Sequence, residues 1–313
     1  MDWLRLLWRM HRWEGTFVIG GALLLSAAMA IVAWQLDGSR DLVVACYEQP
    51  GEMLSADCRS AIEWGNTLAG AIGILGAVAT VAPFAAGIFL GAPLLSREIE
   101  HRTAPMAWSL SSSRRSWLVW RTTPLLVLLL VSLLVLGQAS AFLLETAEEG
   151  ELGFRHFGMF GPILAARGLA VFGIGVLVGL VLGRVLPALL VTALATVALV
   201  GGMSIGRDLL MREEAEWVPM GDQAEVVHMV FDQGFRSDDT GEIITYEQAY
   251  NRYPDAFDSM TGEGEVPGTT LVWRIVPPEA FGLYVAREIG VLAIVLTMAG
   301  AVTLGFVVVR RPE

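Results

Sequence analysis

Residues 122–144 read TTPLLVLLLVSLLVLGQASAFLL, and none of these side chains carries a charge. At about 1.5 Å per residue, an α-helix of this length crosses the ~30 Å hydrocarbon core of a bilayer. Four other uncharged runs are long enough to do the same: 15–36, 65–96, 185–206 and 289–309. A sixth, 168–183, is shorter, but ten more uncharged residues precede it across Arg167. The sequence therefore predicts six spans, with Arg167 at the outer end of one of them.

The overall composition agrees with these runs. Of the 313 residues, 54% are hydrophobic and 17% charged, and the mean hydropathy is +0.57. That balance leaves too little polar surface for a soluble domain. We therefore expect an all-α polytopic membrane protein with six transmembrane helices.

All 21 basic residues are arginine, and the sequence contains no lysine. A P-loop needs a lysine to reach the terminal phosphates, and a Schiff-base enzyme needs an amine that can lose its proton. The four histidines are far apart, and neither His-Glu-x-x-His nor Cys-x-x-Cys occurs. We therefore predict no cofactor or metal in this chain and no nucleic-acid partner. If the protein uses ATP, another chain must hydrolyse it.

The distribution of arginine predicts the orientation. The N-terminus, the segment 96–121, the turn at Arg184 and the C-terminal tail together carry 11 arginines and 5 acidic residues. The rest of the chain carries 10 arginines and 27 acidic residues. Because positive residues stay on the cytoplasmic side, both termini are predicted to lie inside, an N-in/C-in arrangement.

Residues 1–14 alternate tryptophan, leucine and methionine with three arginines. This pattern favours a separate amphipathic helix along the inner headgroups, ahead of spans one to five in residues 15–206. A simple positive anchor before the first span is the alternative reading.

The predicted outside loop 37–64 contains both cysteines, Cys46 and Cys58. They are a candidate disulfide, worth ~3 kcal/mol for a loop of this size, and two free thiols are the alternative. Ser60 and Glu63 have capping-box spacing and predict the start of the second span.

The second span is predicted to contain a kink or a break. Its 32 uncharged residues overshoot the bilayer and include Pro83 and Pro93. Glycines also recur every four residues, at Gly87 and Gly91 in this span and at Gly175, Gly179 and Gly183 in the run 168–183. Such ladders let helices approach closely, and we expect packing within the chain rather than a dimer seam.

Residues 207–280 form a 74-residue insert between spans five and six, with 16 acidic residues and 5 arginines. We predict a small acidic extracytoplasmic domain, followed by the sixth span and the cytoplasmic tail in 281–313. Thr245 and Gln248 have capping-box spacing and predict a helix over 246–253. The acidic excess could concentrate a cationic substrate, but a solvated surface explains it as well.

One catalytic motif is matched weakly. Gly202-Met-Ser204-Ile-Gly206 fits Gly-x-Ser-x-Gly, which requires a strand–turn–helix context and a nearby histidine and acid. Here it lies at the end of a predicted membrane helix. We therefore interpret the chain as a non-enzyme.

Segment 96–121 is the most informative part of the sequence, and we call it the coupling region. Both charge signs occur within one turn of the predicted membrane exit, at Arg97, Glu98, Glu100 and Arg102. An anionic membrane surface rewards positive charge alone, so a mixed cluster favours a protein partner. An ordinary solvated connector is the alternative.

The residues around this region resemble the signature of actinobacterial ABC transporter permeases of the ABC-2 exporter family. That pattern is Pro-Leu-x-x-Arg-Glu-x-Glu-x-Gly-Thr, then Trp-x-Gln, then Arg-Arg-x-Trp. The matching residues are Pro93, Leu94, Arg97, Glu98, Glu100, Thr103, Trp108, Arg114, Arg115 and Trp117. Arg102 replaces the usual glycine and Leu110 the usual glutamine, which puts the local turn in question.

The resemblance implies the transmembrane subunit of an ATP-driven exporter in a bacterial plasma membrane. It would pair with a second permease subunit, identical or different, and with two ABC ATPase subunits that hold ATP and Mg²⁺. The residues it implies for coupling to the ATPase are Arg97, Glu98, Glu100, His101, Arg102 and Thr103. The apolar spans favour lipid contact and an amphiphilic substrate, although they would look alike for any cargo. A non-transporting accessory or immunity protein that binds a partner is the alternative function.

Overall fold

The computed structural model describes residues 2–47, 55–104, 106, 113–147, 154–159, 161–219, 230–257 and 266–309. The chain divides into two compact units. The first comprises residues 1–149, 158–200 and 287–313, and the second comprises 150–157 and 201–286. Each unit is described by itself below.

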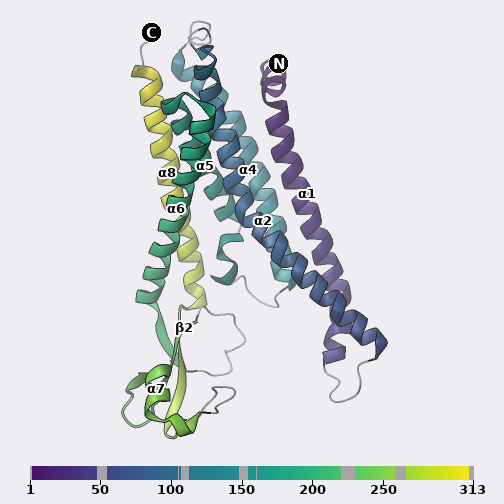
Figure 1. The fold of residues 1–313 in the computed structure, drawn as a ribbon, viewed down its shortest axis with the longest axis vertical. Coiled ribbons are helices and arrows are strands. Elements are labelled where there is room, and N and C mark those ends of the chain that lie inside the picture. Colours follow the sequence, from purple (N-terminus) through teal and green to yellow (C-terminus); the bar gives the residue numbers. More distant parts are fainter. Residues whose placement is uncertain are drawn as a thin grey trace. The chain divides into compact units, whose positions relative to one another are not determined.

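Six helices are long and apolar enough to cross a membrane, as predicted. They are α1 (Asp2–Tyr47), α2 (Ala56–Glu100), α4 (Arg114–Ala147), α5 (Gly161–Leu182), α6 (Val185–Glu214) and α8 (Phe281–Val309). The fold class is therefore confirmed. Within the first unit, the described ends of α1 and α8 lie at the same end of the helices (Figure 1). The side of the membrane on which they lie stays a prediction.

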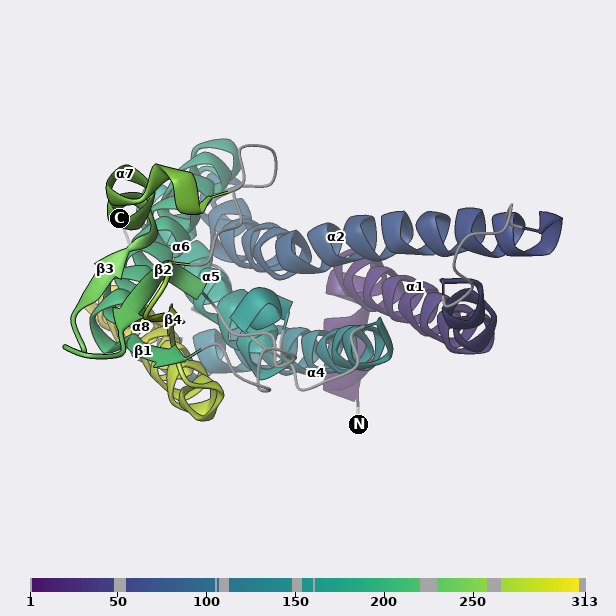
Figure 2. The ribbon, with the colours of Figure 1, turned by 90° about the horizontal axis from the view of Figure 1, so that it is seen from below.

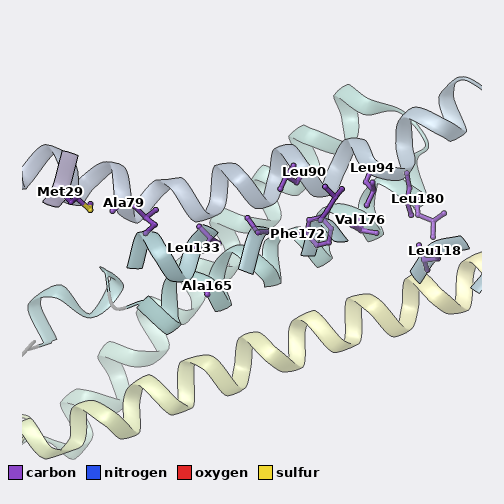
Figure 3. Packing of buried hydrophobic residues seen from close by; sticks show 14 of the residues in the cluster. Met29, Ala79, Leu90, Leu94, Leu118, Leu133, Ala165, Phe172, Val176 and Leu180 are labelled. Atoms are coloured by element: carbon purple, nitrogen blue, oxygen red, sulfur yellow. The ribbon is translucent and has the colours of Figure 1, made fainter. Parts of the chain in front are cut away.

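Helix α5 is the centre of the first unit. In its apolar window 72% of the residues are buried, against 44% in α4 and 22% or less in the other spans. It packs along α2 and α4, while α1 packs along α2 and α4 from the other side (Figures 1 and 2). Phe172 and Leu180 of α5 meet Leu90 and Leu94 of α2 and Leu133 of α4 in this core (Figure 3).

Glycines bring the backbones of α2 and α5 into contact. A Cβ added at Gly91 would lie 2.5 Å from the carbonyl oxygen of Phe172, and one at Gly179 would lie 2.4 Å from that of Ala92. A Cβ at Gly87 would lie 2.6 Å from the carbonyl oxygen of Gly168. These glycine ladders therefore serve packing within the chain, as the sequence analysis expected.

The N-terminal segment differs from the prediction. Residues 2–14 form one unbroken helix with the first span instead of a separate interfacial helix. No proline interrupts this segment, and the single glycine at position 15 does not end a helix on its own. The expected separate helix is therefore corrected to the first turns of α1.

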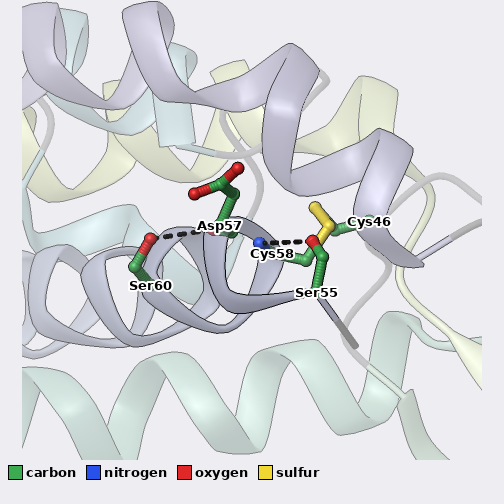
Figure 4. Close-up of a disulfide and its surroundings, with 5 residues drawn as sticks. All are labelled: Cys46, Ser55, Asp57, Cys58 and Ser60. Atoms are coloured by element: carbon green, nitrogen blue, oxygen red, sulfur yellow. Dashed lines mark hydrogen bonds between the residues drawn. A yellow bond between two sulfur atoms is a disulfide. The ribbon is translucent and has the colours of Figure 1, made fainter. Parts of the chain in front are cut away.

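The predicted outside loop 37–64 is also shorter than expected. Helix α1 runs on to Tyr47, and α2 begins at Ala56 with Ser55 as its N-cap. The Ser55 hydroxyl accepts a hydrogen bond from the Cys58 amide at 3.2 Å, so the predicted cap at Ser60 is wrong. A disulfide joins Cys46 to Cys58 and ties the two helix ends together (Figure 4).

The expected break at the prolines of the second span is absent. Helix α2 continues through Pro83 and Pro93 to Glu100, a length of ~68 Å. Each proline removes one backbone hydrogen bond, and close packing on α5 supports the helix there. The coupling region thus begins as the last turn of α2.

The second unit contains a four-stranded antiparallel sheet in the order β1-β4-β2-β3. The strands are β1 (Glu216–Pro219), β2 (Val230–Ser237), β3 (Ile243–Thr245) and β4 (Thr269–Ile275). The sheet was not anticipated, because the sequence analysis recognised only a helix and a loop in this insert. Helix α7 (Tyr246–Arg252) does follow the predicted capping box. Its Gln248 amide donates to the Thr245 hydroxyl at 3.3 Å, and the Thr245 amide donates to Gln248 Oε1 at 3.0 Å.

Two aromatic clusters stabilise the second unit. Phe235, Tyr246 and Phe257 pack between the sheet and α7, with ring centroids 5.2–6.1 Å apart. In a second cluster, Phe154 of the short helix η1 (Phe154–Met159) packs edge-on against Phe281 and Tyr284 of α8. Two further short helices, η2 (Pro254–Ala256) and η3 (Pro278–Ala280), complete the described elements.

Candidate functional site at the end of α2

The last turn of α2 closes with a Schellman motif. The Arg102 amide donates to the Ile99 carbonyl at 3.1 Å, and the Thr103 amide donates to the Glu98 carbonyl at 2.9 Å. Arg102 adopts the left-handed conformation, with φ 57°, that this motif requires at the residue after the cap. The position where the resemblance expects glycine is therefore the one that favours glycine physically, and the turn forms despite the arginine.

Glu98 links α2 to α4. Its carboxylate forms an ion pair with the Arg121 guanidinium, and both side chains are largely buried. The Arg121 guanidinium also lies 6.0 Å from the centroid of the Trp117 ring. Among the described residues, the buried Glu98 Oε2 and Arg121 Nε have no hydrogen-bond partner. The charge of Glu98 is thus directed into the fold.

Glu100 links α2 to α6. Its Oε2 accepts a hydrogen bond from the Val185 amide, the first of α6, at 3.0 Å. A carboxylate at a helix N-terminus satisfies an otherwise unpaired amide and interacts favourably with the helix dipole. The adjacent turn also contacts α2, because a Cβ on Gly183 would lie 2.8 Å from Ile99 Cγ2. Gly183 has φ 62°, so both the space and the backbone there favour glycine.

The predicted site residues therefore separate into two groups. Half-buried Glu98 and exposed Glu100 contact other helices of the same chain. The second group, Arg97, His101, Arg102 and Thr103, is exposed at the helix end and the turn that follows it. The sequence analysis grouped all six as one surface. Trp108 and Leu110, which also belong to the resemblance, lie outside the described residues.

Sequence reasoning missed Arg121, Gly183 and Val185 as parts of this site. One signal was present: Glu98 and Glu100 are two residues apart, and side chains at that spacing on a helix do not face the same neighbour. Once α2 is known to be helical to Glu100, its two carboxylates have to meet different elements.

A second buried ion pair lies between spans. Arg167 Nε of α5 donates to Glu288 Oε1 of α8 at 2.7 Å, and Arg167 Nη1 donates to the Gly158 carbonyl at 3.3 Å. Arg167 lies near the start of its span, toward the end where the sequence placed it. Helix α5 begins at Gly161, so Arg167 lies in its second turn.

The weak catalytic motif lies in a helix. Residues 202–206 are all within α6, whereas the Gly-x-Ser-x-Gly motif acts at a strand–turn–helix junction. The local geometry at Ser204 therefore does not support a nucleophile there.

Residues 19–207 match the family model described as ABC-2 membrane transporter related. This match covers more than half of the chain, from within the first span to the last third of α6, and includes all described residues of the coupling region. The chain belongs to the ABC-2 membrane transporter related family. No curated protein and no solved structure matches it.

Membership of this family makes the chain a multi-pass transmembrane component of an ABC transporter. Such components associate with ABC ATPases, which carry out the hydrolysis. An ABC ATPase is therefore the kind of partner against which the exposed segment at the end of α2 has to be judged.

Proposed function

We propose that this chain is the transmembrane subunit of an ATP-driven exporter in a bacterial plasma membrane. Two copies of it, or this chain and a second permease, pair with two ATPase subunits that bind ATP and Mg²⁺. The observation that supports this is the family match together with the exposed cluster at the end of α2. The absence of lysine agrees with a separate ATPase, because this chain has no P-loop.

The proposed contact with the ATPase is the Schellman turn and its neighbours. Arg97, His101, Arg102 and Thr103 are exposed there, and the rigid helix end behind them can pass on a displacement. Closure of an ATPase pair moves α2 only if this contact differs in free energy between the two states. The cargo we propose is amphiphilic, in keeping with the apolar character of the spans.

Co-purification and charge reversal test this function. The full transporter, extracted in mild detergent, should retain an ATP-binding subunit whose hydrolysis is stimulated by this chain. Arg97→Glu with Arg102→Glu should reduce that stimulation, because both side chains are exposed at the proposed contact. The matched control is Arg59→Glu, an exposed arginine at the opposite end of α2. Transport by the isolated chain without any ATPase would contradict the proposal and favour a different class of membrane protein.

A further inference from the structure

Helix α6 makes fewer close contacts with the other helices of the first unit than α5 does. The extensive helix contacts among the described helices connect α1, α2, α4 and α5, and α6 is not among them. Only 17% of the apolar window of α6 is buried, against 72% for α5. Helices α2 and α5, by contrast, meet backbone to backbone along their glycines. The direction of α6 therefore depends on fewer close backbone contacts than that of α5, although Ala188 and Thr192 are buried on one of its faces.

A two-residue link precedes the first turn of α6. The described link between α5 and α6 is Gly183 and Arg184, and Gly183 has a positive φ of 62°. Glycine places little restriction on its own backbone angles. The link through Gly183 therefore does little by itself to fix the direction of α6 relative to α5. A hinge of one or two residues can absorb a large change in backbone angles while the helices on either side stay rigid.

The Glu100 carboxylate bridges this hinge from α2. It accepts the Val185 amide at 3.0 Å, while Ile99, one residue earlier, packs against Gly183. The same last turn of α2 carries the exposed coupling residues and the ion pair to α4. One helical turn therefore carries the proposed contact with the ATPase, and it also contacts α4 and the start of α6.

We propose that Glu100 is the positioning residue that fixes α6 to the body formed by α2 and α5, so that movement of the coupling region moves α6. This inference rests on the proposed function for the source of the movement. The joint at Glu100 has to persist in both states of the transporter, because two elements move as one body only while their contact is kept. The contact with the ATPase, in contrast, has to change.

The test measures the distance between spin labels on α6 and α4. Leu194→Cys and Val131→Cys are suitable sites, because both side chains are exposed on their helices. The native cysteines form a disulfide and do not react with the label. Distances are measured in the complete transporter, first without nucleotide and then with ATP trapped.

With Glu100 intact, we expect a narrow distance distribution that stays the same when ATP is trapped, because α4 and α6 are both joined to α2. Glu100→Ala should broaden the distribution without nucleotide, raising the displaced population roughly five-fold, as expected for loss of a helix N-cap. It should also make the distance between the labels change when ATP is trapped, and it should reduce transport, while the ATPase still co-purifies. Glu100→Gln keeps an acceptor oxygen, so its distance distribution and its response to ATP should lie between those of the unchanged protein and Glu100→Ala. It replaces the alanine variant in the test if that variant does not fold.

The matched control is Glu63→Ala, which removes an exposed carboxylate from the other end of the same helix and should change neither measurement. If Glu100→Ala changes neither the width of the distribution nor its response to trapped ATP, the inference is wrong. If no ATPase accompanies the unchanged chain, the proposed function is wrong, and with it the role of Glu100 in transmission. The width of the distance distribution without nucleotide still tests, independently of the proposed function, whether Glu100 fixes α6.

Discussion

Arg102 shows how a single backbone angle can constrain a site. Its φ of 57° places an L side chain in the left-handed region, which costs roughly 1–2 kcal/mol for a residue other than glycine. Two hydrogen bonds of the Schellman motif hold it there. The backbone is strained at Arg102, and the arginine side chain there is exposed and can contact a partner.

We expect Arg102→Gly to stabilise the protein and to weaken coupling. Relief of the left-handed strain outweighs the ~0.5–1 kcal/mol of extra chain entropy that glycine loses on folding. Thermal unfolding in detergent should show a higher midpoint for Arg102→Gly than for Arg102→Ala, which loses the same side chain but keeps a Cβ. Equal midpoints for the two variants would contradict this explanation of the turn.

At the scale of elements, the contact between α2 and α5 is the most extensive one among the described helices. Added Cβ atoms at Gly91 and Gly179 meet backbone oxygens, and backbone cannot move aside as a flexible side chain can. By contrast, nothing lies within 4 Å of a Cβ added at Gly70 of the same α2.

Gly91→Ala and Gly179→Ala should therefore each destabilise the protein, by about 1–3 kcal/mol for overpacking. Gly70→Ala is the matched control and should be neutral or slightly stabilising, because alanine favours the helix by ~1 kcal/mol over glycine. Thermal midpoints of the three purified variants measure the difference. A loss at Gly70 equal to that at Gly91 would show that the cost at Gly91 does not come from its contact with α5.

The ion pair between α5 and α8 makes a second prediction at this scale. Glu288→Gln leaves the buried Arg167 charge without its carboxylate, and breaking such a pair costs about 3–5 kcal/mol. Arg167→Met with Glu288→Leu removes both charges and should cost much less than either single change. Thermal unfolding of the single and double variants measures this coupling, and additive losses would mean that the pair contributes no mutual stabilisation.

At the scale of the whole molecule, charge predicts the orientation in the membrane. The segments assigned to the inside carry a surplus of arginine, and the insert 207–280 is strongly acidic. The insert, a sheet with a helix, would then lie outside the cell with the disulfide-bonded ends of α1 and α2.

Labelling with a membrane-impermeant thiol reagent checks this orientation. In intact cells the reagent should react with Asp239→Cys in the insert and not with Arg115→Cys in the coupling region; both positions are exposed. After permeabilisation both should react, which controls for accessibility of the Arg115→Cys thiol. The reverse pattern would place the coupling region outside and exclude contact with a cytoplasmic ATPase.

Much of the fold could be predicted from the sequence. The six spans, the capping box at Thr245 and the glycine ladders were all recognisable, because each depends on residues close together in the chain. The boundaries of α1 and α2 were not, since apolar runs mark the membrane core and say little about where a helix continues beyond it. The sheet of the insert was missed for lack of a clear alternating pattern.

The sequence alone determined that this chain has six segments apolar enough to span a membrane and that it has no P-loop lysine. Transfer of apolar residues into lipid is summed along a local run, and a missing lysine is missing in any fold. The tertiary structure alone decided which coupling residues face outward and which hold helices together. The Glu100 carboxylate and the Val185 amide are 85 residues apart, and their contact depends on how α2, α5 and α6 pack.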